Sequence, residues 1–547
     1  MSPLQRTSRE VDRCGLTLEK RRCYNVLVHY ILFVLIVIAG LSPLLTFARL
    51  WQVKEWRIDR LREHLRHEGW FKQLFGVVKP SVTALGLIVL IIGIIFDVKI
   101  GRFLLSDISL FFTVGLLAWF TLFRFVIFKQ AHPVWTLKSF AVSAFAFVLF
   151  CTISFVAANY MDIALIAIIA IALPLFAFVF VGISLGVFYP LDHLMKIRIL
   201  VRARNVREKC ENLTVVGITG SVGKTTTKEL LSHILKDREM LVTPAHVNTE
   251  MGVANLIIKK LKNKHQIFIV EMGAYRKGEI KLLCSLAKPQ MGIITFIGRQ
   301  HLGLFGNQEE LCKAKGELFE ALPAEGHAFL NTDSEHSAHL MERSSCPVHT
   351  ISTGGHASYE AFDIQESSKG ITFTLRDVHF EVPLQGTHQI TNVLLAVTCA
   401  ESLGVPIAES AKRLNDFHGM PQTFERKDGA QGQLVLDDTH NTSPASFRAA
   451  IEWAKLQKGS PKILVTEGLL ELGKDEDLIH RELGLLSRDV FDEVVFLSKK
   501  CVRYFEQGFG STVTRADKKK FKIALSEGML IVCEGRMPES VVQRLLS

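Results

Sequence analysis

The sequence contains no cysteine pair of the kind that binds zinc or builds a disulfide framework. Its ten cysteines are scattered over 547 residues, and none belongs to a C-x-x-C motif. Neither kind of site is predicted, and a reducing compartment is the simplest expectation. A small-residue cleavage site after a single apolar core is also lacking, so no removed signal peptide is expected. No pattern resembles a serine triad, which argues against that chemistry.

Acidic residues are too few to balance the basic ones, with 54 Asp and Glu against 64 Lys and Arg, a net charge of +10. A basic chain can bind nucleic acid, but no recognition motif accompanies the charge, so no nucleic-acid partner is expected. Much of the excess lies beside apolar segments, as is typical of the cytoplasmic flanks of membrane spans. These flanking residues are Arg6, Arg9, Arg13, Lys20, Arg21 and Arg22, those from Arg49 to Lys79, and those from Lys196 to Arg204.

Charged residues are almost absent from the centres of five apolar segments in the first 190 residues. These segments account for the 48% hydrophobic content and the mean hydropathy of +0.25. A span needs roughly 20 mostly apolar residues, so four or five transmembrane helices are predicted, with anchoring as the simplest role. Recognition of a lipid-linked substrate is the alternative. The segments lie at about 26–48, 82–98, 108–128, 139–158 and 163–189.

The orientation of these spans poses a conflict. An ATP-using domain after the last span must be cytoplasmic, and five spans would then place the basic N-terminus outside, against the positive-inside rule. One solution is that the first segment, interrupted at Gly40–Pro43, re-enters and returns without crossing.

A glycine turn between a strand and a helix follows the apolar region. Residues 213–220 form a short apolar strand, and a helical pattern runs to about Leu235. In such a turn, backbone N–H groups face phosphates, Lys224 adds a charge, and the Thr225 hydroxyl can coordinate Mg²⁺. The spacing departs from the strict P-loop because Ile218 stands at the first glycine position. The predicted ATP-binding residues here are Gly220, Ser221, Gly223, Lys224, Thr225 and Thr226.

Two further side chains with metal-ligand chemistry follow apolar runs. Glu271 ends the run Ile267–Val270, and His301 follows the run Gly292–Gly298. Strand ends meet at one edge of a parallel sheet, and oxygen and imidazole ligands suit Mg²⁺ or Mn²⁺. Thr225, Glu271 and His301 are therefore the predicted metal ligands. Lys315, taken alone, is expected to be a solvated helical lysine.

A series of motifs resembles those of the Mur ligases, enzymes that add amino acids or dipeptides to the cell-wall precursor, and most of all the dipeptide-adding branch. The resemblance implies a magnesium-binding Glu271, a metal-binding His301, a carbamylated Lys315 and an adenine-contacting Asn392. Together with Lys224, the first three would be the catalytic residues. The motifs are T-G-S-V-G-K-T-T, Asn248-Thr249 with Gly252, Glu271-Met-Gly-Ala, His301–Gly306, Ala314–Phe319, Asn331-Thr-Asp333 and Gly386–Asn392.

The C-terminal motifs depart further from the family pattern. Residues 437–444 resemble D-D-x-Y-N-A-N-P, which implies a nucleotide contact for Asp438, but His440 and Ser443 replace the Tyr and the second Asn. Glu534-Gly-Arg536 resembles K-G-S-R with Glu534 in place of the lysine. The residues implied in substrate binding are Asn248, Thr249, Asn441 and Arg536.

The predicted fold is a helical transmembrane region, then an α/β P-loop ATPase domain and a smaller α/β Rossmann-like domain. The predicted boundaries are 1–23 for a basic segment, 24–195 for the membrane region, 210–420 for the ATP-binding domain and 421–547 for the C-terminal domain. The resemblance implies ATP and Mg²⁺, with two ions expected. The family's small uridine-binding domain has no counterpart directly before the ATP loop, so the membrane region or a partner would bind the acceptor.

Three functions stay open at this point. The first is an ATP-dependent ligase that joins D-alanyl-D-alanine or a similar amine to a peptidoglycan precursor through an acyl phosphate. The second is the same chemistry on another carboxylate, such as a lipid-linked one, and the third is a non-catalytic nucleotide-binding membrane protein. For all three the expected location is a bacterial inner membrane, with several spans, contact with the lipid bilayer and the ligase domains in the cytoplasm.

Overall fold

The computed structural model describes most of the chain in two compact units, Met1–Met195 and Lys196–Ser547. The described residues are 18–75, 84, 85, 88, 91, 92, 95, 104–126, 131–160 and 172–547, apart from gaps at 246, 299–304, 306, 335–336, 368, 418, 441–442, 470–471, 473–474, 499–500 and 519–520.

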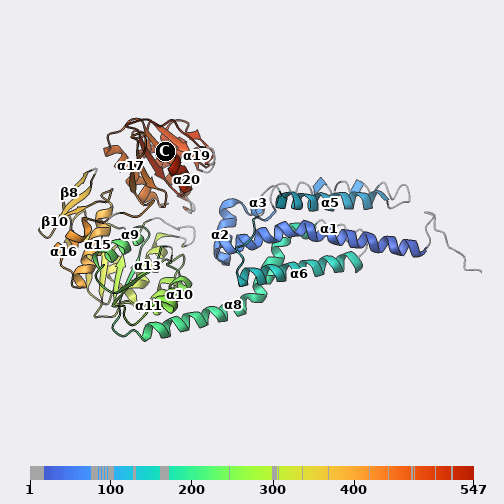
Figure 1. The fold of residues 1–547 in the computed structure, drawn as a ribbon, viewed down its shortest axis with the longest axis horizontal. Helices are drawn as coiled ribbons and strands as arrows, with labels where there is room; N and C mark the ends of the chain where they lie inside the picture. Colours follow the sequence, from blue (N-terminus) through green and yellow to red (C-terminus); the bar gives the residue numbers. More distant parts are fainter. Residues whose placement is uncertain are drawn as a thin grey trace, which may run out of the picture. The chain divides into compact units, whose positions relative to one another are not determined.

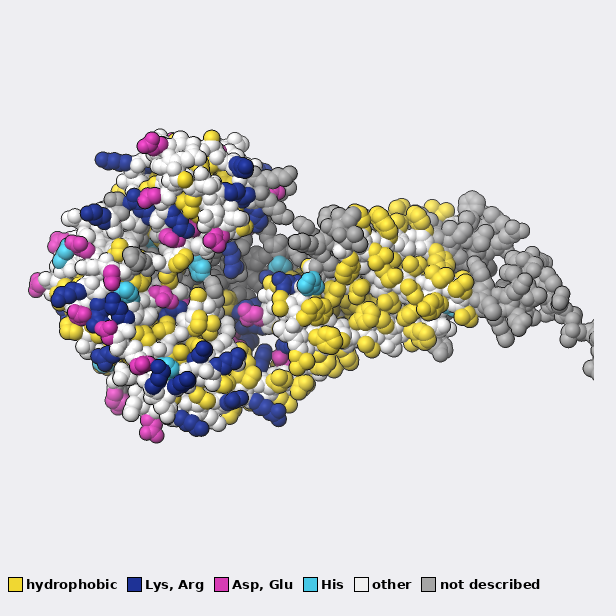
Figure 2. All heavy atoms as spheres, viewed as in Figure 1, with side chains coloured by type: hydrophobic (Ala, Val, Ile, Leu, Met, Phe, Trp, Pro, Cys, Tyr) yellow, Lys and Arg dark blue, Asp and Glu magenta, His cyan; other side chains and the backbone are white. Residues whose placement is uncertain are grey.

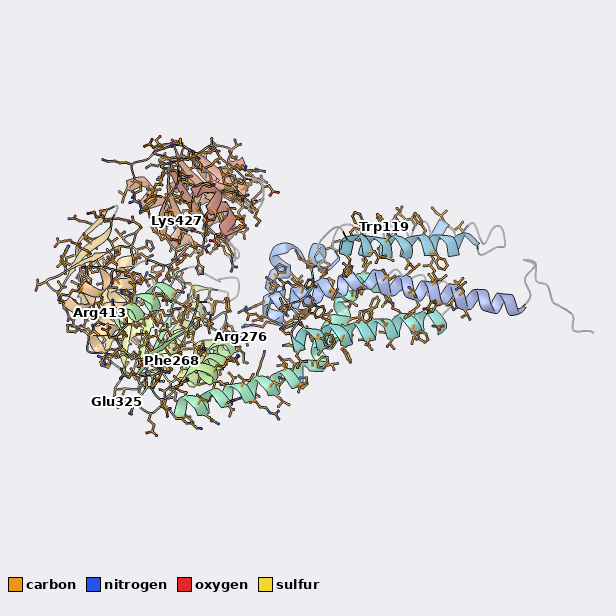
Figure 3. The ribbon with its side chains drawn as sticks, in the orientation of Figure 1. Trp119, Phe268, Arg276, Glu325, Arg413 and Lys427 are labelled. Atoms are coloured by element: carbon orange, nitrogen blue, oxygen red, sulfur yellow. The ribbon has the colours of Figure 1, made fainter. Side chains whose placement is uncertain are left out.

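The first unit consists of helices. Three of them, α1, α5 and α6, run alongside one another (Figure 1). Hydrophobic side chains dominate the visible face of this unit, whereas Lys, Arg, Asp and Glu are spread over the second (Figure 2). Trp119, for example, projects from α5 and is 60% exposed (Figure 3). The helices are α1 Leu18–Val53, α2 Ile58–Glu68, α3 Trp70–Phe75, α5 Leu104–Val126, α6 Leu137–Tyr160 and α8 Ala177–Glu208.

Within the described residues, three helices are long and apolar enough to cross a membrane: Val26–Val53, Leu137–Asn159 and Ala177–Glu208. The apolar part of α5, Leu110–Phe123, is shorter. The second predicted segment, 82–98, falls mostly outside the described residues, as does the start of the fifth. The number of spans therefore stays a prediction.

The predicted re-entrant turn in the first segment is wrong. Helix α1 is continuous through Pro43. Gly40 lies against the Phe150 ring of α6, where an added Cβ would come within 2.3 Å of that ring. The glycine therefore permits close helix packing and does not break the helix, and the conflict over orientation is not resolved in this way.

The second unit begins with a seven-stranded parallel sheet in the order β2-β3-β1-β4-β5-β6-β7. Its central strands are buried on both faces, as expected of parallel strands covered by helices. On β3, Ile267 and Ile269 pack on one face, while Phe268 (Figure 3) and Val270 pack on the other. The strands are β1 Thr214–Thr219, β2 Met240–Val242, β3 Ile267–Glu271, β4 Met291–Ile294, β5 His327–Asn331, β6 Val348–Ser352 and β7 Tyr359–Glu360.

Helices cover both faces of this sheet, and a small antiparallel sheet, β10-β9-β8, packs on one of them. The strand and helix predicted around the glycine turn are confirmed as β1 and α9. The helices are α9 Lys224–Ile234, α10 Glu250–Lys260, α11 Glu279–Ala287, α13 Gln308–Glu320, α14 Ser337–Met341, α15 Gln389–Ser402 and α16 Ile407–Leu414; the small sheet is β8 Phe362–Ser367, β9 Gly370–Leu375 and β10 Val378–Val382.

The end of α8 is anchored to α11 and to the segment that leads into β1. The buried Arg207 guanidinium donates hydrogen bonds to the carbonyls of Ala287, Cys210 and Leu213, at 2.8, 3.0 and 3.3 Å. Arg204 donates to the Ser285 hydroxyl at 2.8 Å. Part of the basic run after the last apolar segment thus has a structural role, in addition to the membrane-flanking role predicted for it.

A second sheet, in the order β11-β12-β16-β13-β14-β15, forms the C-terminal part, with only its β11 edge antiparallel. Both α/β parts with parallel sheets predicted from sequence are confirmed. The strands are β11 Glu425–Asp428, β12 Leu434–Asp438, β13 Lys462–Thr466, β14 Glu493–Phe496, β15 Thr514–Arg515 and β16 Leu530–Glu534; the helices are α17 Pro444–Leu456, α18 Glu476–Ser487, α19 Val502–Phe509 and α20 Glu539–Leu546.

Candidate active site

The turn between β1 and α9 requires glycine at two positions. Gly220 has φ of +148°, and a Cβ there would lie 1.9 Å from Thr295 Oγ1. Gly223, the N-cap of α9, has φ of +86°, and a Cβ there would lie 2.2 Å from Asn392 Oδ1. A left-handed conformation without side-chain bulk turns the chain tightly at the helix N-terminus, where backbone N–H groups can bind phosphate.

Replacing Gly223 by Ala is expected to raise the Kd for ATP about tenfold or more. The left-handed conformation alone costs a non-glycine residue about 1–2 kcal/mol, and the clash with Asn392 Oδ1 must displace the Asn392 side chain. Gly404→Ala is the matched control, since Gly404 also has positive φ (+85°) but has no atom within 4 Å of the added Cβ. Titration with a fluorescent ATP analogue measures both. Equal affinities in the two variants would contradict this assignment.

One cavity of about 220 Å³ brings most of the predicted chemistry together. Its walls include the glycine turn, the start of α9, the end of β3 and Lys315 of α13, with three further residues from the segment after α16 and the end of β12. The lining residues are Gly220, Ser221, Val222, Gly223, Lys224, Thr225, Thr226, Ala245, Asn248, Glu271, Gly273, Ala274, Tyr275, Leu311, Lys315, Met420, Thr423 and His440.

Lys224 folds back over the glycine turn. Its Nζ donates to the carbonyls of Gly220 at 2.9 Å and Ser221 at 3.0 Å. Burial lowers the pKa of Lys224, an effect that the nearby Glu271 carboxylate opposes. The two carbonyl contacts hold the ammonium at the mouth of the anion-binding turn, where a phosphate oxygen can replace them.

The Glu271 carboxylate is held from several sides at the end of β3. Thr225 Oγ1 donates to its Oε2 and Asn248 Nδ2 donates to its Oε1, each at 3.0 Å. Burial raises the pKa of Glu271, but the charge of Lys224, the Asn248 hydrogen bond, the charge of Lys228 and the Thr225 hydrogen bond together outweigh it and lower that pKa. Because the carboxylate and the Thr225 hydroxyl converge in the cavity, they form an oxygen-rich corner that suits a hard cation.

Lys315 is buried, so the expectation of a solvated lysine was wrong. Its side chain lines the cavity, is 3% exposed, and forms no hydrogen bond or ion pair with the described residues. Burial and the charge of Lys224 lower the pKa of Lys315 to about 7, although the carboxylates of Glu279 and Glu271 oppose the shift. Such an amine is largely neutral at slightly alkaline pH and can therefore act as a nucleophile.

A second cavity of about 220 Å³ also adjoins the glycine turn and shares Val222 and Gly223 with the first. Asn392 lines it, and its side chain accepts from Thr227 Oγ1 at 3.3 Å and donates to Gln389 Oε1 at 2.8 Å. Burial lowers the pKa of His388 to about 4, which leaves a neutral imidazole. The lining residues are Val222, Gly223, Phe296, Asn331, Asp333, Thr353, His388, Thr391, Asn392, Ala445 and Ser446.

Asp438 is fully buried at the end of β12 and lines neither cavity. It accepts from the Phe424 N–H at 2.8 Å and from the Ser446 hydroxyl. Its register partner on β16 is Glu534, the residue that replaces the family's lysine. Burial and the nearby Asp438 carboxylate raise the pKa of Glu534 well above its ordinary value. Two buried carboxyl groups thus lie side by side where the resemblance implied a nucleotide-contacting aspartate and a lysine.

Replacing Glu534 by Gln is expected to stabilise the protein at neutral and alkaline pH, because the substitution removes a buried carboxyl group that is costly to ionise. The folded-state pKa is raised, so the stability of the parent falls as pH rises from the ordinary glutamate value through the folded-state value. The stability advantage of Glu534→Gln over the parent should therefore shrink as the pH is lowered toward 4.5. Thermal unfolding of the full chain at several pH values measures it, with the exposed Glu527→Gln as control. Parallel melting curves for parent and Glu534→Gln at every pH would contradict the assignment.

Four other predicted site residues are not among the residues that line the two cavities. His301 and Asn441 lie outside the described residues. The Thr249 hydroxyl accepts from the Gly252 N–H at 3.4 Å as the N-cap of α10, and Arg536 is exposed after β16. Roles in substrate binding for these residues, and a nucleotide contact for Asp438, stay predictions.

Sequence reasoning missed several lining residues, among them Tyr275, His388, Met420 and Thr423. His388 and Tyr275 stand inside or beside quoted motifs, which could have indicated them. Met420 and Thr423 carry no local signal.

Comparisons with known proteins agree with this geometry. The family described as "Mur ligase middle domain" matches residues 218–400. The UDP-N-acetylmuramoyl-tripeptide–D-alanyl-D-alanine ligase of Bacillus subtilis is 31% identical over 325 residues, which cover 57% of this chain and 70% of that protein. The Escherichia coli ligase of the same name is 30% identical over 294 residues, 52% of this chain and 65% of that protein.

Solved structures give the same result. MurF from Acinetobacter baumannii has a TM-score of 0.58 at 25% identity, covering 64% of this chain and 80% of that one. MurF ligase from Thermotoga maritima, solved in complex with ADP, has a TM-score of 0.57 at 27% identity, covering 64% of this chain and 82% of that one. The N-terminal helical region is absent from these relatives.

Proposed function

Because the chain belongs to the Mur ligase family of ATP-dependent ligases, we propose that it activates a carboxylate of a peptidoglycan precursor and joins it to D-alanyl-D-alanine or a similar amine. One observation carries this proposal. Lys224, Thr225, Glu271 and Lys315 line a single cavity with residues of the C-terminal part. A nucleotide, a metal ion and two further substrates could meet there.

The proposed chemistry has two steps. The acceptor carboxylate attacks the γ-phosphorus of ATP, an acyl phosphate forms, and ADP leaves. The amine then attacks the acyl carbon, the C–N bond forms, the bond to phosphate breaks, and the amine's excess proton leaves with phosphate or solvent. In the first step Lys224 would stabilise charge on the transferred group, and the backbone N–H groups of the turn would hold the phosphates.

Side chains from the start of α9 and the end of β3 fit a Mg²⁺ ion. Thr225 and Glu271 offer oxygen ligands that already converge, and His301 is the predicted third ligand. When bound, Mg²⁺ neutralises phosphate charge during transfer. A buried, largely neutral Lys315 amine in the same cavity fits carbamylation, which would turn a cation into an anion that can support a metal ion.

The acceptor is the least constrained part of the proposal. Among the described residues directly before β1 lies α8, and the helical region has no counterpart in the relatives. Three helices apolar enough to cross a membrane favour location in a bacterial inner membrane, with the ligase part in the cytoplasm. A membrane-bound ligase could take either a UDP-linked or a lipid-linked muropeptide.

The full chain in detergent or vesicles should be assayed with ATP, Mg²⁺ and D-alanyl-D-alanine against a UDP-linked tripeptide and a lipid-linked tripeptide. Mass spectrometry of the product identifies the amide. We expect product with at least one acceptor. Product with the lipid-linked acceptor alone would assign acceptor binding to the membrane region. Absence of product with both acceptors and a panel of amino acids would overturn the proposal.

A further inference from the structure

Lys228 is a fully buried cation that the proposed chemistry leaves unused. It lies on α9, one turn after Lys224, and its side chain is 0% exposed. Lysine is almost never fully buried unless it is paired, because taking an ammonium out of water is costly. The residue does not line either cavity, so it cannot touch a bound nucleotide directly.

The surroundings of Lys228 explain its burial. Its Nζ donates to the Thr243 carbonyl at 2.8 Å and lies 3.2 Å from Glu229 Oε1 and 3.6 Å from Glu271 Oε2. Thr243 is also buried, and its hydroxyl accepts from the Glu271 N–H at 2.9 Å. A single residue after β2 therefore fixes both the lysine ammonium and the backbone of the cavity glutamate.

The neighbours of the Glu271 carboxylate fall into two groups. Thr225 and Asn248 line the cavity and contact the carboxylate at 3.0 Å each. Lys228 reaches Oε2 from the protein interior, since its side chain is fully buried and lines neither of the two described cavities. The interior cation compensates the buried carboxylate and restrains it, while the cavity side is left to groups that a metal ion can displace or join.

We propose that Lys228 is a positioning residue that holds Glu271 in the orientation in which it binds a divalent cation. The inference rests on the proposed metal role of Glu271. The lysine is a positioning and not a catalytic residue, because a side chain that lines neither cavity would touch neither the nucleotide nor the metal ion. Removing it leaves a buried carboxylate without its interior partner, and the carboxylate should then turn away from the metal position.

The test is direct metal binding to the full chain. Mn²⁺ replaces Mg²⁺, and its free concentration is followed by electron paramagnetic resonance at saturating ADP. Lys228→Met is expected to raise the Mn²⁺ Kd about tenfold or more, while ADP affinity without metal changes less than about twofold. In turnover assays, Lys228→Met should raise the Mg²⁺ concentration needed for half-maximal rate. This fold-change should exceed the fold-decrease in kcat measured at saturating Mg²⁺.

Lys427→Met is the matched control. Lys427, which is labelled in Figure 3, also pairs with a fully buried carboxylate: it donates to Asp437 Oδ2 at 2.6 Å in the C-terminal sheet. It should show a comparable loss of stability with unchanged Mn²⁺ affinity. If Lys228→Met does not fold, Lys228→Gln replaces it, because glutamine can keep a hydrogen bond to Thr243 without the charge. The Mn²⁺ Kd of that variant should likewise rise about tenfold or more.

The outcomes separate this inference from the proposed function. If Glu271→Gln leaves Mn²⁺ binding unchanged, the metal role of Glu271 is wrong, and the inference fails with it. If Glu271→Gln abolishes binding but a folded Lys228 variant binds Mn²⁺ as the parent does, only the inference is overturned. Tighter binding in the Lys228 variant would overturn it as well, because the lysine would then act as a repelling charge.

Discussion

Replacing Lys224 by Ala is expected to lower kcat/KM for ATP by about a thousandfold, or about 4 kcal/mol of transition-state stabilisation. Lys224 is the cation at the mouth of the glycine turn, where it donates hydrogen bonds to the carbonyls of Gly220 and Ser221. Because charge on the transferred phosphoryl group develops during the reaction, a fixed ammonium contributes most in the transition state.

The measurement is steady-state ADP release from the full chain. Lys236→Ala is a suitable control, since Lys236 is half exposed beyond the same helix and pairs with Asp416 at 3.6 Å. It should retain the parent's activity. A Lys224→Ala variant that kept a tenth or more of the parent's kcat/KM would rule out the proposed role.

Replacing Lys315 by Ala is expected to lower kcat at least a hundredfold, since the carbamate that would form there is lost. In the parent, an amine with a pKa of about 7 is protonated below that pH and cannot add CO₂. Carbamate formation joins the neutral nitrogen to CO₂ and releases one proton. The activity of the parent should therefore fall as the pH drops below 7. Above pH 7, activity lost on removal of CO₂ should return when bicarbonate is added.

Two measurements check this prediction. The first is activity of the parent after removal of CO₂ and after its return. The second is the activity of Lys313→Ala, which removes a partly exposed lysine of the same helix that pairs with Glu309 and Glu310 at 2.7 and 2.9 Å. It should be fully active. Full activity of Lys315→Ala, or indifference of the parent to bicarbonate, would show that Lys315 is not modified for catalysis.

The parts of the site that follow from local sequence could be predicted. The apolar run before Thr219 and the glycine turn after it fixed a strand, a loop and a helix, because each depends on residues next to one another. Glu271 could be placed at the same edge because the carboxyl ends of parallel strands converge.

Other features depend on residues far apart in the chain and could not be predicted. Lys315 has the local pattern of a solvated helical lysine, and only the packing of α13 beside the glycine turn buries it. Gly40 and Pro43 looked like a break in a span, but contact with Phe150 of α6 stabilises a continuous helix. The sequence shows Glu534 as a departure from the K-G-S-R pattern. Its position next to Asp438 could not be predicted, because the two residues are almost a hundred residues apart and meet only where β16 lies beside β12.

Coupling of ATP use to two substrates tests the central claim most directly. ADP and phosphate release should be measured for the full chain with Mg²⁺·ATP, a muropeptide acceptor and D-alanyl-D-alanine, each omitted in turn. An ATP-dependent amide ligase predicts one ADP and one phosphate per amide formed, with amide formation abolished when either substrate is missing. If the chain binds ATP tightly but forms no amide with any of the acceptor and amine combinations tested, the ligase assignment is wrong. The chain would then be a nucleotide-binding protein without ligase activity.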